Sequence, residues 1–294
     1  MQRFLDPSVL SSISGLELIA KTVVDGFIAG LHRSPDFGFS QEFAEYRSYS
    51  EGDDLRHVDW NVYARTERAY LKRYRGETNT QLSILLDASA SMAYGSHKVN
   101  KLDYARYLAA SIAYMSNGQR DAVGIMTFDD EVRQYVPASS RHGQFVRVLH
   151  AIESAVPGKR TDFQKPFLHC MNFLRRRGVL VVISDFYAEP QRVVDTMSPL
   201  RSHGDELILF HLLDPQEIRP SMKDPAVLVD METGDEIEVS PDYMKQEYPQ
   251  KVDAHIAAMK DQAQRSGIDY FMLDTSKPLD SALRDYLLVR QGRA

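Results

Sequence analysis

The sequence has very little cysteine and no long apolar run. Among its 294 residues there is one cysteine, Cys170, so no disulfide can form within the chain and a zinc site made of several cysteines is excluded. Such cysteine usage is typical of a reducing compartment, and we expect a cytoplasmic location. Residues 107–119 form the longest stretch without a charged side chain, shorter than the ~18–20 residues that a membrane-spanning helix needs. The first ten residues lack the apolar segment of a signal peptide, and we predict no membrane span.

Basic residues are outnumbered as well. The chain has 35 Lys and Arg residues against 41 Asp and Glu residues, a formal net charge of −6. The excess of acid is local, since residues 205–253 contain 13 acidic and 4 basic side chains. A nucleic-acid-binding protein shows a concentrated basic face, so we expect no nucleic-acid partner. A helix and a hairpin exposed to solvent are the favoured interpretation of the acidic stretch.

Short apolar runs alternate with amphipathic segments from residue 81 onward. Runs typical of buried strands occur at residues 82–86, 122–128, 179–184, 206–213 and 268–273. Apolar residues at helical spacing predict helices between them, and Thr233-Gly234-Asp235 predicts a hairpin. This alternation predicts an α/β fold over residues 81–294, with a mostly parallel sheet and helices on both faces.

The first 80 residues differ from the rest. A helix over about residues 15–32 is predicted by the spacing of Leu16, Ile19, Val23, Phe27 and Leu31. From residue 37 to residue 80, aromatic and charged residues interleave without a long period, which indicates short strands and ordered loops. We therefore expect residues 1–80 to form an N-terminal extension that packs on the main domain of residues 81–294.

Oxygen-bearing side chains follow two of the predicted strands. Asp87, Ser89 and Ser91 come after the first strand, Asp185 comes after the strand at 179–184, and Thr161 lies at a loop-to-helix junction. Ligands of open α/β sheets bind at the carboxyl ends of the strands, near the point where strand order reverses. Oxygen ligands without His or Cys select Mg²⁺, Mn²⁺ or Ca²⁺ rather than zinc. These residues therefore predict an open metal site that a partner's carboxylate could complete, with simple capping of turns as the alternative.

The same five residues resemble the metal-ion-dependent adhesion site of von Willebrand factor A-like domains. A further set resembles the signature of the bacterial "domain of unknown function 58" family: Glu42-Phe43, Arg47-Ser48-Tyr49, Gly52-Asp53-Asp54, Arg56, Asp59-Trp60, Ala64-Arg65 and the later His211-Leu212-Leu213-Asp214-Pro215. The resemblance spans about residues 37–214. It implies a von Willebrand factor A-like (Rossmann-like) fold, an Mg²⁺-dependent interaction role and a MoxR-type AAA ATPase as partner.

One departure from the family concerns the metal site. Thr161 is commonly preceded by glycine in such sites, whereas Lys159-Arg160 precede it here. A cation at this place would weaken metal binding or reach an acidic ligand. Asp162 is expected to support the site from behind the ligands. His211 is expected either to do the same or, by preference, to be a core histidine with its hydrogen bonds made.

A second acidic cluster lies in the extension, where Asp53, Asp54, His57 and Asp59 fall within seven residues. One interpretation is a second metal site or a general acid or base. The favoured interpretation is structural, with the acids capping turns and pairing with arginines such as Arg56. Trp60, the sole tryptophan of the chain, is then expected at the packing seam of the extension.

Three functions are compatible with these residues. The favoured one is a non-enzymatic protein-interaction module that binds an acidic partner residue through Mg²⁺, Mn²⁺ or Ca²⁺. The alternative is a metal-dependent hydrolase that uses the strand-end oxygens or the cluster in the extension, but no nucleophile–base pair is evident. The third is a scaffold with a lapsed metal site that binds partners through its acidic region.

Overall fold

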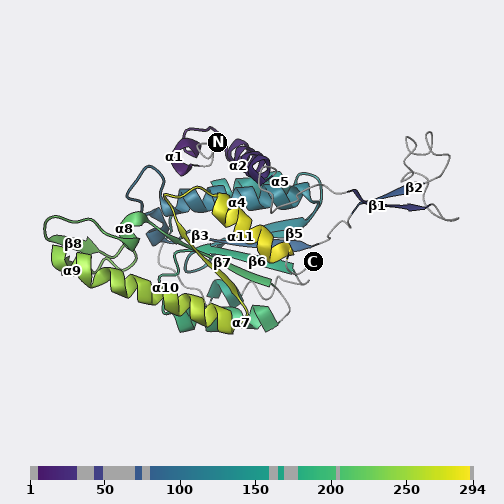
Figure 1. Cartoon of the computed structure of the whole chain (residues 1–294). Helices are drawn as coiled ribbons and strands as arrows, with labels where there is room; N and C mark the ends of the chain where they lie inside the picture. The colour runs from purple at the N-terminus through teal and green to yellow at the C-terminus, as the bar shows by residue number, and fades with distance from the viewer. Residues whose placement is uncertain are drawn as a thin grey trace.

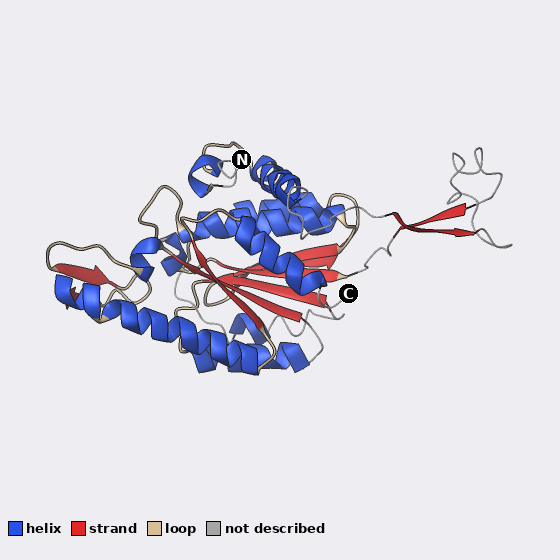
Figure 2. Cartoon of the chain, in the orientation of Figure 1, coloured by secondary structure: helices blue, strands red, loops and turns tan. Residues whose placement is uncertain are grey.

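The centre of the molecule is a six-stranded sheet with helices on both faces (Figures 1 and 2). The computed structural model describes residues 6–31, 43–48, 70–74, 80–158, 165–168, 178–202 and 206–291. The strands are β3 (Gln81–Asp87), β4 (Ala122–Phe128), β5 (Val132–Ser139), β6 (Gly178–Ser184), β7 (Glu206–Leu213) and β10 (Asp269–Asp274). Their order is β10–β7–β6–β3–β4–β5, with β5 antiparallel and the other pairings parallel.

This topology confirms the predicted α/β fold and is that of a von Willebrand factor A-like domain. Each predicted strand lies within one or two residues of an observed one, because a strand buried on both faces leaves a continuous apolar run in the sequence. From β3 the chain adds β4 and β5 on one side of the sheet and then β6, β7 and β10 on the other side. A cleft is therefore expected at the carboxyl end of β3, where the strand order reverses.

Two apolar cores lie on the two faces of the sheet. On one face lie α2 (Leu16–Leu31), α4 (Lys101–Gly118), α5 (Gln144–Glu153) and α11 (Asp280–Gln291), and on the other α7 (Pro190–Ser202) and α10 (Tyr248–Arg265) (Figure 1). Successive side chains of a strand point to opposite faces. Accordingly Ile84 and Leu86 of β3 belong to the first core and Leu85 to the second.

The N-terminal helices are part of the main body. Val23, Val24 and Phe27 of α2 are buried in the same core as α4, and the short helix α1 (Pro7–Leu10) adds the buried Leu10. Further along, β1 (Phe43–Ser48) and β2 (Tyr70–Tyr74) pair antiparallel with each other. The boundary at residue 80 stays a prediction, because most of the extension lies outside the described residues. In the described part of the chain, no helix combines the length and the apolar character needed to cross a membrane.

Several smaller elements gather at the end of the sheet where β3 and β6 finish. The predicted hairpin is formed by β8 (Ala226–Val229) and β9 (Glu236–Val239). The next helix, α9 (Pro241–Gln246), begins with a proline and is capped by the Ser240 side chain. Two of these elements, the short helices η3 (Ala90–Ala93) after β3 and α8 (Pro215–Ile218) after β7, were not expected from periodicity. A helix of four residues is too short to show a period.

We predict that Gly124→Ala destabilises the fold. A Cβ atom at Gly124 of β4 would lie 2.5 Å from the backbone nitrogen of Ala138 in β5, where the pairing of the two strands is irregular. Urea unfolding is expected to show a loss of about 1–3 kcal/mol in the free energy of unfolding. In the control Gly118→Ala, at the end of α4, the Cβ meets nothing within 4 Å, and the midpoint should stay the same or rise slightly. Equal midpoints for the two variants would contradict the packing described.

Candidate functional site

The parallel register brings two predicted ligand residues to one edge of the sheet. Asp87 is the last residue of β3, and Ser184, the last residue of β6, pairs with His211 of β7. Ser184 Oγ donates a 2.5 Å hydrogen bond to Asp87 Oδ2, which fixes the alignment of β3 and β6. Asp185 follows directly, so both carboxylates lie at the carboxyl ends of adjacent strands, as the sequence led us to expect.

Asp87 is fully buried and held by hydrogen bonds on both oxygens. Its Oδ1 accepts the backbone N–H of Ser89 at 2.8 Å, and its Oδ2 accepts from Ser184. Burial and the neighbouring Asp185 raise the pKa of Asp87 to about 7, although the hydrogen bonds favour the ionised form. Two carboxylates this close repel each other in the protein interior, and a divalent cation between them would relieve that repulsion.

One carboxylate oxygen of Asp185 has no hydrogen-bond partner in the part of the chain that the structure describes. Its Oδ2 lies 2.7 Å from Lys101 Nζ, whereas its buried Oδ1 has no hydrogen-bond partner among the described residues. The next residue, Phe186, has a φ of 44°, a left-handed conformation that is strained for a bulky side chain and turns the chain sharply. A buried polar atom without a partner is costly, so Asp185 Oδ1 fits a cation or a water bound to one.

The remaining ligands available at this edge are hydroxyl groups. Ser89 Oγ lies 3.1 Å from Ser91 Oγ, which donates a 3.1 Å hydrogen bond to Glu232 Oε1 at the tip of the β8–β9 hairpin. The described residues contain no group of three or more His, Cys, Asp or Glu side chains that could hold a metal, so a cation here needs these hydroxyls. Oxygen-only coordination of this kind suits Mg²⁺.

Several predicted residues lie outside the described part of the chain. These are Thr161 and Asp162 of the metal site, the preceding Lys159 and Arg160, and the cluster in the extension with Asp53, Asp54, Arg56, His57, Asp59 and Trp60. Their roles therefore stay predictions.

A buried lysine that the sequence analysis did not identify contacts Asp185 of the candidate site. Lys101, the first residue of α4, is fully buried, with Nζ 2.7 Å from Asp185 Oδ2 and 2.6 Å from Glu217 Oε1. Burial alone would lower the pKa of Lys101, but the two carboxylates outweigh burial and raise it. The rings of Tyr94 and Tyr187 each lie 5.8 Å from the ammonium group. A lysine at the start of a helix looks like a surface residue in the sequence, so nothing there indicates this role.

Glu217 is held next to Lys101 by the segment that follows β7, which carries the motif His211-Leu212-Leu213-Asp214-Pro215. Asp214 caps α8, accepting from Gln216 N–H, while Glu217 Oε2 accepts the Asp214 N–H at 2.8 Å. This capping box holds the other oxygen of Glu217 on Lys101. His211 is buried with Nδ1 2.6 Å from Tyr270 Oη, and burial lowers its pKa to about 3, so its ring is neutral at neutral pH.

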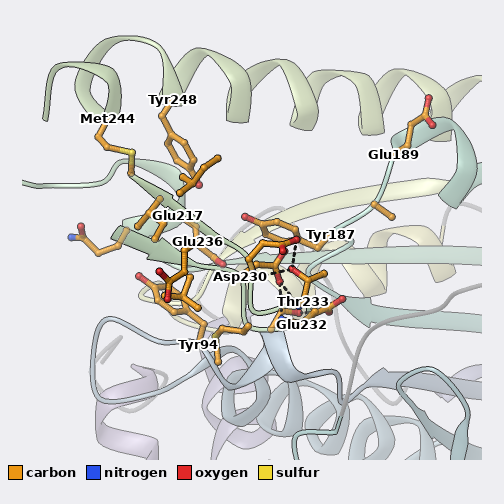
Figure 3. Close-up of a pocket in the computed structure, with 18 of the residues that line it drawn as sticks. Tyr94, Tyr187, Glu189, Glu217, Asp230, Glu232, Thr233, Glu236, Met244 and Tyr248 are labelled. Carbon is orange, nitrogen blue, oxygen red and sulfur yellow. Dashed lines mark hydrogen bonds between the residues drawn. The ribbon is translucent and has the colours of Figure 1, made fainter. Parts of the chain in front are cut away.

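A groove of about 950 Å³ opens beside the site, under the β8–β9 hairpin (Figure 3). Its aromatic lining comes from Tyr94, Tyr187 and Tyr248, and Arg192 is the one basic residue among the described residues that line it. The acidic residues of the lining are Asp130, Glu189, Glu217, Asp230, Glu232, Asp235 and Glu236. The acidic stretch seen in the sequence is thus partly gathered around this groove.

The sequence matches a family whose function is not known. Residues 45–258 match the family described as "Protein of unknown function DUF58". "Uncharacterized protein Rv1480" of Mycobacterium tuberculosis is 30% identical over 234 residues, covering 78% of this chain and 73% of the relative. "Uncharacterized protein Mb1516" of Mycobacterium bovis has the same values. These descriptions assign no catalytic activity to the proteins that carry them.

Solved structures of low sequence identity are also similar. The "conserved hypothetical protein BatB" from Bacteroides thetaiotaomicron matches with a TM-score of 0.49 and 14% identity, over 72% of this chain and 98% of that chain. The "SpRpn10 VWA domain" matches with a TM-score of 0.40 and 14% identity, over 69% and 92%. Both TM-scores lie below 0.5, so the description of the fold rests on the strand order of the sheet and not on these structures.

Loss of the buried ammonium group is expected to destabilise the protein. Lys101→Met leaves Asp185 and Glu217 buried without their counter-charge, which should lower the free energy of unfolding by about 3–5 kcal/mol in urea titrations with EDTA present. Adding Glu217→Gln should recover part of the loss. The control Lys98→Met removes an exposed lysine nearby and should change stability by less than about 0.5 kcal/mol. Similar losses for both lysines would show that the buried ion pairs do not matter.

Proposed function

Because the chain belongs to the DUF58 family and folds as a von Willebrand factor A-like domain, we propose that it is a protein-interaction module whose strand-end site binds Mg²⁺. The observation that carries the proposal is Asp185 Oδ1, a buried carboxylate oxygen without a hydrogen-bond partner among the described residues. It lies at the end of β6, beside a second buried carboxylate, Asp87. Such a pair is costly without a cation, and costly groups persist where function needs them.

The residues that would hold the ion are Asp87, Ser89, Ser91 and Asp185, with Thr161 as the ligand that the family resemblance adds. When bound, the ion supplies a Lewis acid that accepts a carboxylate oxygen from a partner protein. Ser184 and the Ser89 N–H hold the Asp87 carboxylate in place, and Lys101 fixes one oxygen of Asp185. The chain's own side chains therefore orient the ligands before an ion arrives.

The groove restricts the chemistry of the partner. A strongly acidic surface would be repelled by the carboxylates around it, which include Glu189, Glu217 and Glu236. We therefore propose a partner that brings one carboxylate to the metal and surrounds it with apolar and basic side chains. The family resemblance implies a MoxR-type AAA ATPase in this role, and a cytoplasmic location stays a prediction from cysteine usage.

Calorimetric titration of Mg²⁺ and Mn²⁺ into the protein tests the metal site. The wild-type chain should bind, and Asp87→Asn should weaken binding by more than about tenfold, because a charged ligand is lost while the shape of the side chain is kept. The control Asp130→Asn removes an acid at the rim of the same groove and should bind as the wild type does. Absence of binding to the wild-type chain would reject the metal site.

Capture of a purified MoxR-type ATPase on the immobilised protein tests the partner. Binding should require Mg²⁺, should be lost with EDTA or with Asp87→Asn, and should weaken as salt is raised, because the groove attracts basic side chains of the partner. Binding that ignores EDTA but still falls with salt would favour a scaffold that uses only its acidic surface.

A further inference from the structure

The tip of the β8–β9 hairpin places a carboxylate on the candidate metal site. Ser91 Oγ donates a 3.1 Å hydrogen bond to Glu232 Oε1, although the two residues lie 141 positions apart in the sequence. Glu232 is partly buried, whereas the residues that follow it, 233–238, are exposed. Among the acids of the hairpin, Glu232 is therefore the one that is not fully exposed, and it contacts Ser91, a predicted ligand.

The turn at the tip holds Glu232 in that position. Asp230 Oδ1 accepts the backbone N–H groups of Glu232 at 2.7 Å and of Thr233 at 3.0 Å. Thr233 Oγ1 in turn donates to Asp235 Oδ2 at 2.9 Å, and Gly234 adopts a φ of 77°, a conformation that glycine takes without strain. These local bonds fix the backbone of the turn from which the side chain of Glu232 extends toward Ser91.

The two strands of the hairpin bury little apolar surface. Its two strands pair with each other in a separate sheet, and Val239 is the one buried residue among those of β8 and β9. Val227, Val229 and Ile237 are exposed by 50%, 56% and 63%. Moving the hairpin away from the site would therefore expose little apolar surface that is not already in water.

We propose that Glu232 is an internal carboxylate ligand of the metal site. With the ion bound, the hairpin supplies in the same chain the oxygen that a partner's acidic residue would bring, and a partner must displace Glu232 to bind the ion. The inference rests on the proposed function, since it requires a cation at Asp87 and Asp185. It goes beyond that function in two respects. In the free protein Glu232 occupies the coordination position of the partner's carboxylate, and the hairpin therefore competes with the partner for the ion.

The test uses Mn²⁺ as the probe, with calorimetry and water-proton relaxation as two readouts on the full chain. Replacing Glu232 with glutamine should weaken Mn²⁺ binding by about tenfold. It should also raise the relaxation enhancement per bound ion, because a water molecule takes the place of the lost carboxylate. Glu236→Gln is the matched control, since it removes the same charge from the same hairpin at an exposed residue, and it should behave as the wild type does.

The outcomes separate this inference from the proposed function. Should Glu232→Gln match the wild type in both readouts while Asp87→Asn loses Mn²⁺, the metal site stands and the internal ligand is rejected. A weaker affinity with unchanged relaxation, shared by Glu236→Gln, would mean that the hairpin acts only through its charge, which also rejects it. No Mn²⁺ binding by the wild-type chain or by any variant would reject both.

Discussion

The structure depends on the burial of two carboxyl groups at the ends of adjacent strands. Asp87 and Asp185 are buried side by side because β3 and β6 are parallel neighbours in register, so each strand delivers its following polar residue to the same edge. Their repulsion contributes to the high pKa of Asp87. Donors at this edge compensate most of these groups: hydroxyl and amide groups bind Asp87, and an ammonium group binds one oxygen of Asp185. The other oxygen of Asp185 has no hydrogen-bond partner among the described residues, and the proposed cation would bind there.

Lys101 extends that compensation into the architecture. The lysine belongs to α4, Asp185 follows β6, and Glu217 belongs to α8, so one buried ammonium group joins three elements. A buried charge that loses its partner is costly, so the loss of Lys101 is expected to destabilise the fold. The capping box at Asp214 matters for this reason: it holds the Glu217 carboxylate in position next to Lys101. The same network thus holds the Asp185 carboxylate at the candidate site.

Local patterns in the sequence predicted most of the fold and indicated part of the candidate site. Buried strands show as apolar runs, and the rule that ligands bind at the carboxyl ends of parallel strands indicated Asp87, Ser89, Ser91 and Asp185. Lys101, Glu217 and Glu232 could not be found in this way, because their contacts join residues 84, 116 and 141 positions apart and depend on how helices and the hairpin pack. A polar residue in a helix or a turn shows no period that would distinguish a buried contact from an exposed one.

The acidic groove and the internal carboxylate together constrain how such a site can be selective. A cation with an open coordination position would bind any carboxylate, including those of unrelated proteins. With Glu232 as a ligand, a partner would bind only if its further contacts offset the free-energy cost of displacing Glu232. The exposed apolar side chains of the hairpin and the carboxylates of the groove offer such contacts to a surface with matching apolar and basic groups. Selection among partner proteins would then come from the hairpin and the groove, while the ion would supply a bond to the partner's carboxylate that is common to all of them.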